Sequence, residues 1–242
     1  MSTGERASAA DALTVLAGGQ VELQGRLPWS SNATFLVRVC HGDTTMPAVY
    51  KPRRGERPLW DFPEGLFLRE VAAYLLSVEL GWGIVPETVA RADAPLGPGS
   101  LQRFVPADFS EHYFTLLGHP EHQEALQAIA AFDLLANNAD RKSGHCLLGD
   151  EGRIWAIDNG LCFHAQPNLR TVIWDFAGRP LPAGLRTDIE RVAATVAGSE
   201  ALGELLDSEE LEALARRATR VAEQGKFPDP GAARRSYPWP LV

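Results

Sequence analysis

Two aspartates carry the clearest chemical signal in this chain of 242 residues. Asp140 follows an apolar stretch within a polar cluster, and Asp158 follows the strand-like run 153–157. One carboxylate at such a position can orient an acceptor hydroxyl, while a second can hold Mg²⁺ against the phosphates of a nucleotide. Either aspartate alone would be an ordinary surface turn. The spacing of the two predicts a phosphoryl-transfer site, with Asp140 as its catalytic carboxylate and Asp158 as a metal ligand.

His145 lies between the two aspartates, five residues after Asp140. It is a candidate second metal ligand, and because histidine is softer than the oxygen ligands that Mg²⁺ prefers, Mn²⁺ would also suit the site. A structural histidine that is hydrogen-bonded within the loop is the alternative. The neighbouring Arg141 and Lys142 would keep the Asp140 carboxyl ionised, because nearby positive charge favours the charged form.

Lys51 ends a predicted strand and could contact the phosphates of a bound nucleotide. Glu70 begins the next predicted helix and could pair with this lysine. The alternatives are a solvated lysine at a sheet edge and an acid placed favourably near a helix N-terminus.

Ser30, Ser31 and Asn32 join the first two predicted strands. Their backbone N–H groups and hydroxyls could contact phosphate oxygens. The segment has no glycine between Gly25 and Gly42, so an ordinary polar hairpin turn is the alternative.

The first part of the chain reads as a short helix and a small antiparallel sheet, followed by one amphipathic helix and a hairpin. The predicted strands are residues 21–27, 34–39, 46–50, 85–91 and 100–105, and the first helix spans 11–17. In the second helix Val71, Tyr74, Leu75 and Val78 share one face, and Gly81 ends it.

The second part of the chain is predicted to be mostly helical. Helical periodicity covers residues 121–137, 185–196 and 211–221, and Asp207 with Glu210 forms a capping-box pattern before the last of these. The segment 225–242 holds four prolines and is expected to lie extended over the surface. Together these elements predict an α+β bilobal fold, with a sheet lobe over residues 1–106 and a helical lobe over residues 107–242.

Composition narrows the function classes. There are 31 acidic and 23 basic side chains, so the net charge of −8 disfavours nucleic-acid binding. The three cysteines, Cys40, Cys146 and Cys162, have no metal-binding spacing and are odd in number, which argues against a disulfide framework. No apolar stretch is long enough to be a transmembrane segment, and a cytoplasmic protein is expected.

Three segments resemble a known family. Ala156–Phe163 (AIDNGLCF) is similar to the metal-binding segment of the type II phosphatidylinositol 4-kinases. Asp140-Arg141 with His145 resembles the Asp-Arg-x-x-x-Asn catalytic loop of the phosphatidylinositol 3-/4-kinase superfamily, and Gly97–Val105 (GPGSLQRFV) resembles its strand into the inter-lobe hinge. The resemblance covers roughly residues 20–175, and it is strongest to a bacterial group related to that superfamily.

The resemblance implies a protein-kinase-like fold that binds ATP with Mg²⁺ or Mn²⁺. Lys51 would bind phosphate and pair with Glu70, and the backbone at Phe104 and Val105 would receive adenine. Two departures matter: His145 replaces the expected Asn, and the cysteine-rich membrane-anchoring insertion of the type II lipid kinases is missing, so a phosphoinositide substrate is not implied.

The sequence therefore predicts a kinase that moves the γ-phosphoryl group of ATP to a hydroxyl of a lipid, a protein or a small molecule. HipA-type bacterial protein kinases share the same core arrangement of site residues, so a protein Ser/Thr kinase of that kind is one alternative. A pseudokinase that binds nucleotide without turnover is another. A purely structural domain would require both aspartate motifs to be coincidental turns.

Overall fold

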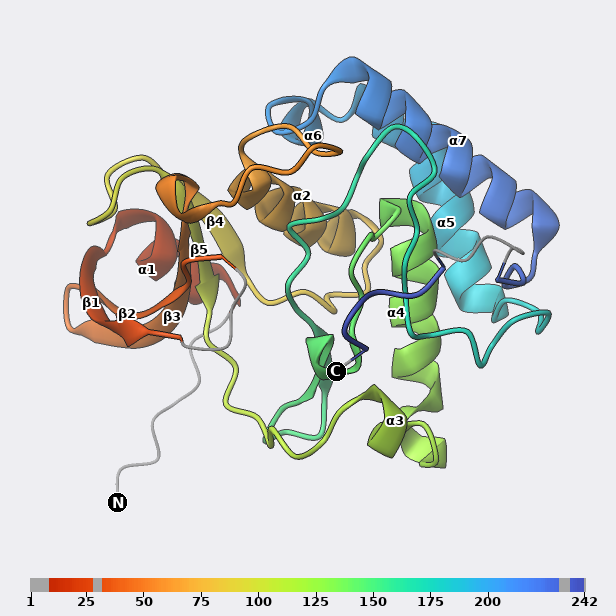
Figure 1. Ribbon diagram of the computed structural model, residues 1–242, viewed down its shortest axis with the longest axis horizontal. Coiled ribbons are helices and arrows are strands. Elements are labelled where there is room, and N and C mark those ends of the chain that lie inside the picture. The colour runs from red at the N-terminus through yellow and green to blue at the C-terminus, as the bar shows by residue number, and fades with distance from the viewer. Residues whose placement is uncertain (1–8, 28–31, 231–235, 242) are drawn as a thin grey trace. The chain divides into compact units, whose positions relative to one another are not determined.

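The computed structural model describes residues 9–27, 32–230 and 236–241 (Figure 1). The chain divides into two compact units. Unit 1 comprises Met1–Val71 and Pro86–Val105, and unit 2 comprises Ala72–Val85 and Pro106–Val242. The predicted Ser30 and Ser31 contacts lie outside the described residues.

Unit 1 is built on a five-stranded antiparallel sheet with the strand order β1-β2-β3-β5-β4. Its elements are α1 (Ala9–Gly18), β1 (Gln20–Arg26), β2 (Phe35–His41), β3 (Thr44–Pro52), the 3₁₀ turn Arg53–Gly55, the start of α2 (Leu66–Glu79), β4 (Thr88–Arg91) and β5 (Gly99–Arg103). All five predicted strands and the short N-terminal helix are confirmed, with ends shifted by a few residues. The β2–β3 hairpin turns at Gly42, whose positive φ of 57° suits a two-residue loop.

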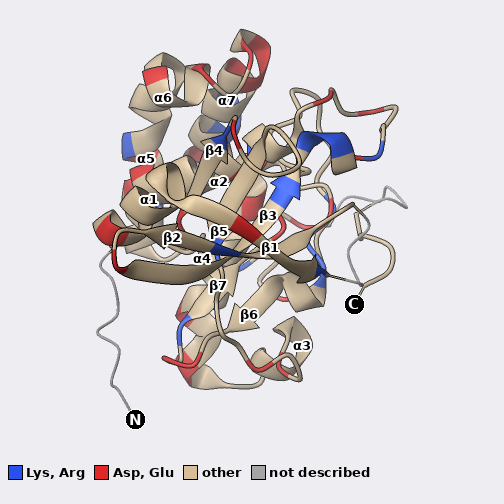
Figure 2. Cartoon of the chain, turned by 90° about the vertical axis from the view of Figure 1, so that its left-hand side faces the viewer, with Lys and Arg blue, Asp and Glu red and all other residues tan. Residues whose placement is uncertain are grey.

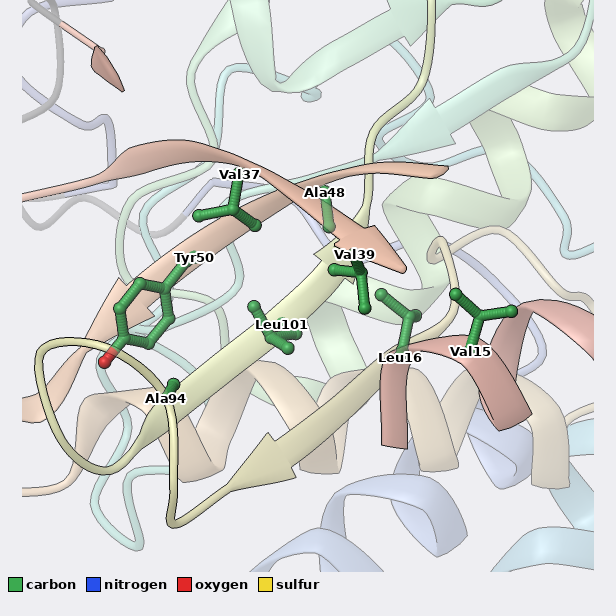
Figure 3. Packing of buried hydrophobic residues seen from close by; sticks show 8 residues of the cluster. All are labelled: Val15, Leu16, Val37, Val39, Ala48, Tyr50, Ala94 and Leu101. Carbon is green, nitrogen blue, oxygen red and sulfur yellow. The ribbon is translucent and has the colours of Figure 1, made fainter. Parts of the chain in front are cut away.

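The core of unit 1 lies between α1 and one face of the sheet (Figure 3). Along β2 the side chains alternate, so Val37 and Val39 are buried while Arg38 is exposed. Leu16 of α1 and Leu101 of β5 meet these valines in the buried cluster. Because β3 pairs with β2, this alternation determines which side chains of β3 face the core. It therefore also determines on which face of the sheet Lys51 lies.

Unit 2 is mostly helical. It contains the rest of α2, α3 (Tyr113–Leu116), α4 (Gln123–Ala136), the hairpin of β6 (Cys146–Leu148) and β7 (Ile154–Ala156), α5 (Ala183–Thr195), α6 (Glu200–Gly203) and α7 (Ser208–Gln224). Helix α7 packs against α5 and α4. The predicted capping box is confirmed: Asp207 accepts from the Glu210 N–H at 2.9 Å, and the Glu210 carboxylate accepts from the Asp207 N–H at 3.2 Å.

One local prediction needs correction, and a second holds with an exception. Val71 and Tyr74 are buried as expected, but Val78 is 51% exposed, because the buried face of α2 runs through Ala72 and Leu76 instead. The segment after α7 was expected to lie over the surface.

The described residues of this segment are mostly exposed, as predicted, but Phe227 and Pro238 are buried. The Phe227 N–H donates to the Arg179 carbonyl at 3.0 Å. The backbone pairing continues at the bridge between Pro180 and Lys226. The fold class itself, α+β with a small antiparallel sheet and a mostly helical second part, is confirmed. Among the described residues, no helix has both the length and the apolar character needed to cross a membrane.

Gly99 brings β5 unusually close to β3. A Cβ atom at this position would lie 2.5 Å from the Lys51 carbonyl oxygen and 2.8 Å from Cα of Pro52. Both atoms belong to backbone, so they cannot move aside without shifting β3. Gly25 in β1 offers a contrast, because a Cβ there would meet nothing within 4 Å.

We expect Gly99→Ala to lower the free energy of unfolding by about 1–3 kcal/mol, since overpacking forces backbone shifts. Gly25→Ala is the matched control and should be neutral or slightly stabilising. Urea unfolding of both variants checks the prediction. Equal stability of the two would show that β3 tolerates displacement at Lys51.

Candidate functional site

Unit 1 contains an ion pair between Lys51 of β3 and Glu70 of α2, which joins Nζ to Oε1. The Glu70 side chain is 3% exposed and that of Lys51 is 20% exposed. A carboxylate this deeply buried depends on its partner, because an unpaired buried charge is costly. The pair therefore fixes the ammonium group at one point near the end of β3.

Some of the other residues predicted to contact the nucleotide in unit 1 already make hydrogen bonds within the protein. The Phe104 N–H donates to the Pro47 carbonyl at 3.2 Å, and Val105 is buried. Asn32 uses its side-chain oxygen to accept from the Arg57 N–H at 3.0 Å. This bond joins Asn32 to the segment after β3 and does not use the Nδ2 donors of Asn32.

Unit 2 places Asp140 in a loop that begins where α4 ends. Asn137 caps the helix in the left-handed conformation, with φ of 53°. The Asp140 N–H donates to the side-chain oxygen of Asn138 at 2.9 Å, which folds the loop back on itself. Lys142 approaches the Asp140 carboxylate at 3.3 Å.

The electrostatic expectation for Asp140 needs correction. Burial raises the pKa of its carboxyl, and the negative charge of Asp158 raises it further. Lys142 and Arg170 oppose this shift without reversing it. The sequence pointed the other way because it shows the adjacent cations but not the loss of solvent. Arg141, the nearest cation in the sequence, does not bond to Asp140; its side chain is directed into the interior.

Asp158 and His145, the two predicted metal ligands, lie side by side. Nε2 of His145 is 3.3 Å from Oδ2 of Asp158. Nδ1 of His145 accepts from the Lys142 N–H at 3.3 Å, so the proton of the neutral imidazole is on Nε2, which faces the carboxylate. This is the hydrogen-bonded histidine that the sequence offered as the alternative to a metal ligand. Asp158 has a positive φ of 57°, so the chain turns sharply at this residue after β7.

A divalent ion shared by Asp158 and His145 requires His145 to give up the Nε2 proton, with Nδ1 then acting as a donor instead of accepting from Lys142. Two ligands about 2.1 Å from one ion are separated by roughly 3 Å when they occupy neighbouring coordination positions, and the His145–Asp158 separation is 3.3 Å. The described residues contain no group of three or more metal-binding side chains. Mg²⁺ characteristically uses one or two protein ligands and completes its shell with water and phosphate oxygens.

Arg141 and Asp133 form an ion pair inside unit 2, and both side chains are fully buried. Nε donates to both Asp133 oxygens, at 3.1 and 3.0 Å, and Nη2 donates to Oδ1 at 2.9 Å. Burial alone would lower the pKa of Arg141, but the Asp133 carboxylate outweighs this effect and raises it. The arginine therefore stays charged.

The remaining donors of Arg141 tie together the two segments that carry the candidate site. Nη2 also donates to Oδ1 of Asn159 at 2.7 Å, and Nη1 donates to the Ile157 carbonyl at 2.7 Å. A longer contact of 3.4 Å joins Nη1 to the His145 carbonyl. The guanidinium group thus holds the residues on both sides of Asp158 and the carbonyl of His145.

Asp133 is held just as completely. It accepts from Nδ2 of Asn138 at 3.0 Å and from the Thr171 hydroxyl at 3.3 Å, in addition to Arg141. Asp133 is not among the residues predicted from the sequence. The available signal was an acid within the apolar run 129–136 of the predicted helix, since a buried acid requires a partner.

The segment 236–241 reaches the same loop from the far end of unit 2. The Ser143 N–H donates to the Leu241 carbonyl at 2.9 Å. The Ser236 carbonyl accepts from the Thr171 N–H at 3.1 Å and from Nε1 of Trp174 at 3.0 Å. The loop between Asp140 and His145 is therefore held by a segment about one hundred residues later in the chain.

Solved structures identify the class of fold. The structure of hydra Fam20 with sugar has a TM-score of 0.64 against this chain, with 15% identity, and the match covers 89% of this chain and 87% of that one. The Helicobacter pylori proinflammatory kinase CtkA has a TM-score of 0.49, with 10% identity over 88% of this chain and 94% of CtkA. The chain thus has a protein-kinase-like fold, as predicted.

Sequence comparison then identifies the family. No protein-family model matches the chain. Protein Rv2133c of Mycobacterium tuberculosis is 38% identical over 266 aligned positions, which cover 95% of each chain. The chain belongs to the same family as Rv2133c. The predicted kinship to kinases is supported at the level of fold, whereas the narrower resemblance to phosphatidylinositol 3-/4-kinases is not confirmed.

We expect Asp133→Ala to lower the free energy of unfolding by about 3–5 kcal/mol, because it leaves the buried Arg141 without its counter-charge. Glu212→Ala is a suitable control, since it removes an exposed partner of Arg216; such helix pairs contribute about 0.3–0.5 kcal/mol. Urea unfolding measures both. A small effect at Asp133 would mean that water or a rearranged side chain replaces the carboxylate.

The raised pKa of Asp140 gives a pH-dependent prediction. Since the folded state holds the proton more tightly than the unfolded chain, ionisation of Asp140 costs stability as pH rises above the ordinary Asp value of about 3.9. Asp140→Asn should therefore be more stable than the wild type at neutral pH, with a difference that shrinks on acidification. Urea unfolding across this pH range tests it, with Asp150→Asn in the β6–β7 turn as control. A difference that grows toward low pH would contradict the prediction.

Proposed function

We propose that this protein is a kinase that transfers the γ-phosphoryl group of ATP to a hydroxyl acceptor with the help of Mg²⁺ or Mn²⁺. The observation that carries the proposal is the grouping of Asp140, Asp158 and His145 in one part of unit 2, within a chain of protein-kinase-like fold. We further propose that residues 1–106 and 107–242 act as the two lobes of one kinase domain.

Asp140 is suited to accept a proton from the acceptor hydroxyl. A general base works best when its pKa lies nearer to the working pH than that of an ordinary carboxylate. Burial and the Asp158 charge shift the pKa of Asp140 in this direction. The adjacent Lys142 remains close enough, at 3.3 Å, to hold the carboxylate in place.

Asp158 and His145 would hold the divalent ion, which neutralises charge on the phosphates when bound. Arg141 would keep these ligands in place, since it binds the carbonyls of Ile157 and His145. The nitrogen donor of His145 favours Mn²⁺ more than a pair of oxygen ligands would.

In unit 1, Lys51 would contact the phosphates, oriented by the buried Glu70. Adenine would be received by the carbonyl of Phe104 and the backbone of Val105, because the Phe104 N–H is already donated to Pro47. Of the residues proposed to line the phosphates, Asn32 would contribute its backbone N–H and its side-chain Nδ2, because the Arg57 N–H takes only the side-chain oxygen.

Our proposal specifies the acceptor more closely than the fold alone does. We infer a phosphatidylinositol 3-/4-kinase-like or HipA-like chemistry on a lipid, protein or small-molecule hydroxyl, in a cytoplasmic protein. Support comes from the segments around Asp140 and Asp158. A pseudokinase is the second candidate, favoured by His145 at the position where the resembling kinases have Asn.

The test begins with ATP binding. The melting temperature of the wild type should rise with ATP plus Mg²⁺ or Mn²⁺ and rise less with ATP alone, because ligand binding to the folded state stabilises it. Asp158→Asn should lose the metal-dependent part. Asp150→Asn, an exposed aspartate in the nearby β6–β7 turn, is the matched control and should behave as the wild type does. Absence of any ATP effect on the wild type would refute the proposal.

Turnover then separates the kinase from the pseudokinase. Asp140→Asn should bind ATP as tightly as the wild type but lose about 10²- to 10⁴-fold in rate, because a general base acts in the transition state. The measurement uses labelled ATP with Mn²⁺ and either lysate proteins or lipid extract as acceptors. A wild type that binds ATP but neither transfers phosphate nor hydrolyses ATP would be a binding module.

A further inference from the structure

A cavity of about 640 Å³ lies in unit 1 beside the chain segment that follows β3. Its wall is formed by the turn Arg53–Gly55, by the residues that lead into α2 and by the β4–β5 turn. Neither Lys51 nor Glu70 lines it. Figure 2 shows basic positions gathered at and beyond the end of β3.

The lining carries positive charge that its own acids do not neutralise. Arg53, Arg54 and Arg57 all line the cavity. Arg53 pairs with Glu64 at 2.8 Å. Within the described part of the chain, the side chains of Arg54 and Arg57 make no hydrogen bond or ion pair.

The other acid in the lining, Glu56, is already engaged. Its carboxylate accepts from the Gly65 N–H at 2.9 Å and from the Phe67 N–H at 2.8 Å, which caps the start of α2. Among the described residues, two guanidinium groups therefore remain available, in a protein whose net charge is −8. Such a local reversal of sign attracts an anion.

The backbone that presents these arginines is fixed on both sides. The Arg53 N–H donates to the Pro98 carbonyl at 2.8 Å, and the Ala33 N–H donates to the Gly55 carbonyl at 3.1 Å. The Arg57 N–H donates to the Asn32 side chain at 3.0 Å. A ligand would meet a preformed turn, which lowers the entropic cost of binding.

The rest of the lining is apolar. Phe62 and Leu66 are buried at the base of the segment, and Leu96 comes from the β4–β5 turn. Leu59 also lines the cavity and is 38% exposed. A ligand that fits must combine an anionic group for the arginines with an apolar body for this wall.

We propose that this cavity binds an organic phosphate monoester, with its phosphate between Arg54 and Arg57 and its organic part against Phe62 and Leu96. Planar guanidinium groups match the oxygens of a phosphate through paired N–H bonds. A phosphate monoester carries close to two negative charges at neutral pH, which two unpaired arginines would balance. The site is separate in its residues from the proposed ATP contacts and does not depend on kinase activity.

Phenyl phosphate is the probe, because it combines both halves of the ligand. It is titrated into the whole protein in the presence of EDTA, so that no metal-dependent binding at Asp158 contributes, and affinity is measured by calorimetry. Inorganic phosphate and phenol test each half alone and should bind more weakly. Affinity should fall as the pH is lowered through about 6, where the phosphate gains a proton.

The double variant Arg54→Gln/Arg57→Gln should weaken binding by at least tenfold, since each charge-assisted hydrogen bond contributes about that factor or more. Arg38→Gln is the matched control: it removes a 53% exposed arginine of β2 that pairs with Glu22 and is absent from the lining. It should leave the affinity unchanged. Thermal unfolding verifies that the exposed substitutions keep the fold.

Three results would overturn the proposal. These are no binding of phenyl phosphate at millimolar concentration, equal affinity of the double variant and the wild type, or phenol binding as tightly as phenyl phosphate. Equal affinity in the double variant would place the phosphate elsewhere, and tight phenol binding would make the cavity an apolar pocket without anion selectivity.

Discussion

The buried ion pair of Arg141 and Asp133 is the interaction on which the candidate site of unit 2 depends. Removing two charges from water costs several kcal/mol per ion, and only complete hydrogen bonding compensates for it. Every N–H of the guanidinium group has an acceptor in this structure. The result is one rigid centre from which α4, the Asp140 loop and the residues around Asp158 are all positioned.

The pair also explains why the neighbouring residues Asp140 and Arg141 lie in different environments. Arg141 points inward and is fully buried, whereas Asp140 remains partly exposed. The two consecutive residues therefore differ: Arg141 holds the loop in place, and Asp140 has the chemical role that we propose. Burial and the charge of Asp158 raise the pKa of Asp140, and carboxyl groups with shifted pKa values are frequent at functional sites.

Much of the architecture follows from local sequence patterns. Alternation along β2, helical periodicity in 121–137 and the Asp207–Glu210 box each depend on residues close together in the chain, and all three are present in the structure. The pairing of Lys51 with Glu70 is also present. The predicted roles of Asp140, Asp158 and His145 remain proposals, although the structure brings His145 and Asp158 together.

The predictions that failed concern burial, which depends on the whole fold. Val78 has the same helical spacing as Val71, but solvent reaches it. In the sequence Arg141 is adjacent to Asp140. In the structure its side chain is paired with Asp133, which lies eight positions earlier in the chain. Proline content suggested an extended segment after α7 but gave no indication that Phe227 would be buried.

The hydrogen bond from Ser143 to Leu241 has a consequence for biosynthesis. Chains are made from the N-terminus, and domains begin to fold as they emerge from the ribosome. A nascent chain that already contains α4 and the β6–β7 hairpin still lacks the carbonyl groups of Ser236 and Leu241. The Ser143 and Thr171 amides acquire these partners only after nearly the whole of unit 2 has been translated. The loop that carries Asp140 is consequently completed late, and a truncated translation product would contain both aspartates without the finished loop.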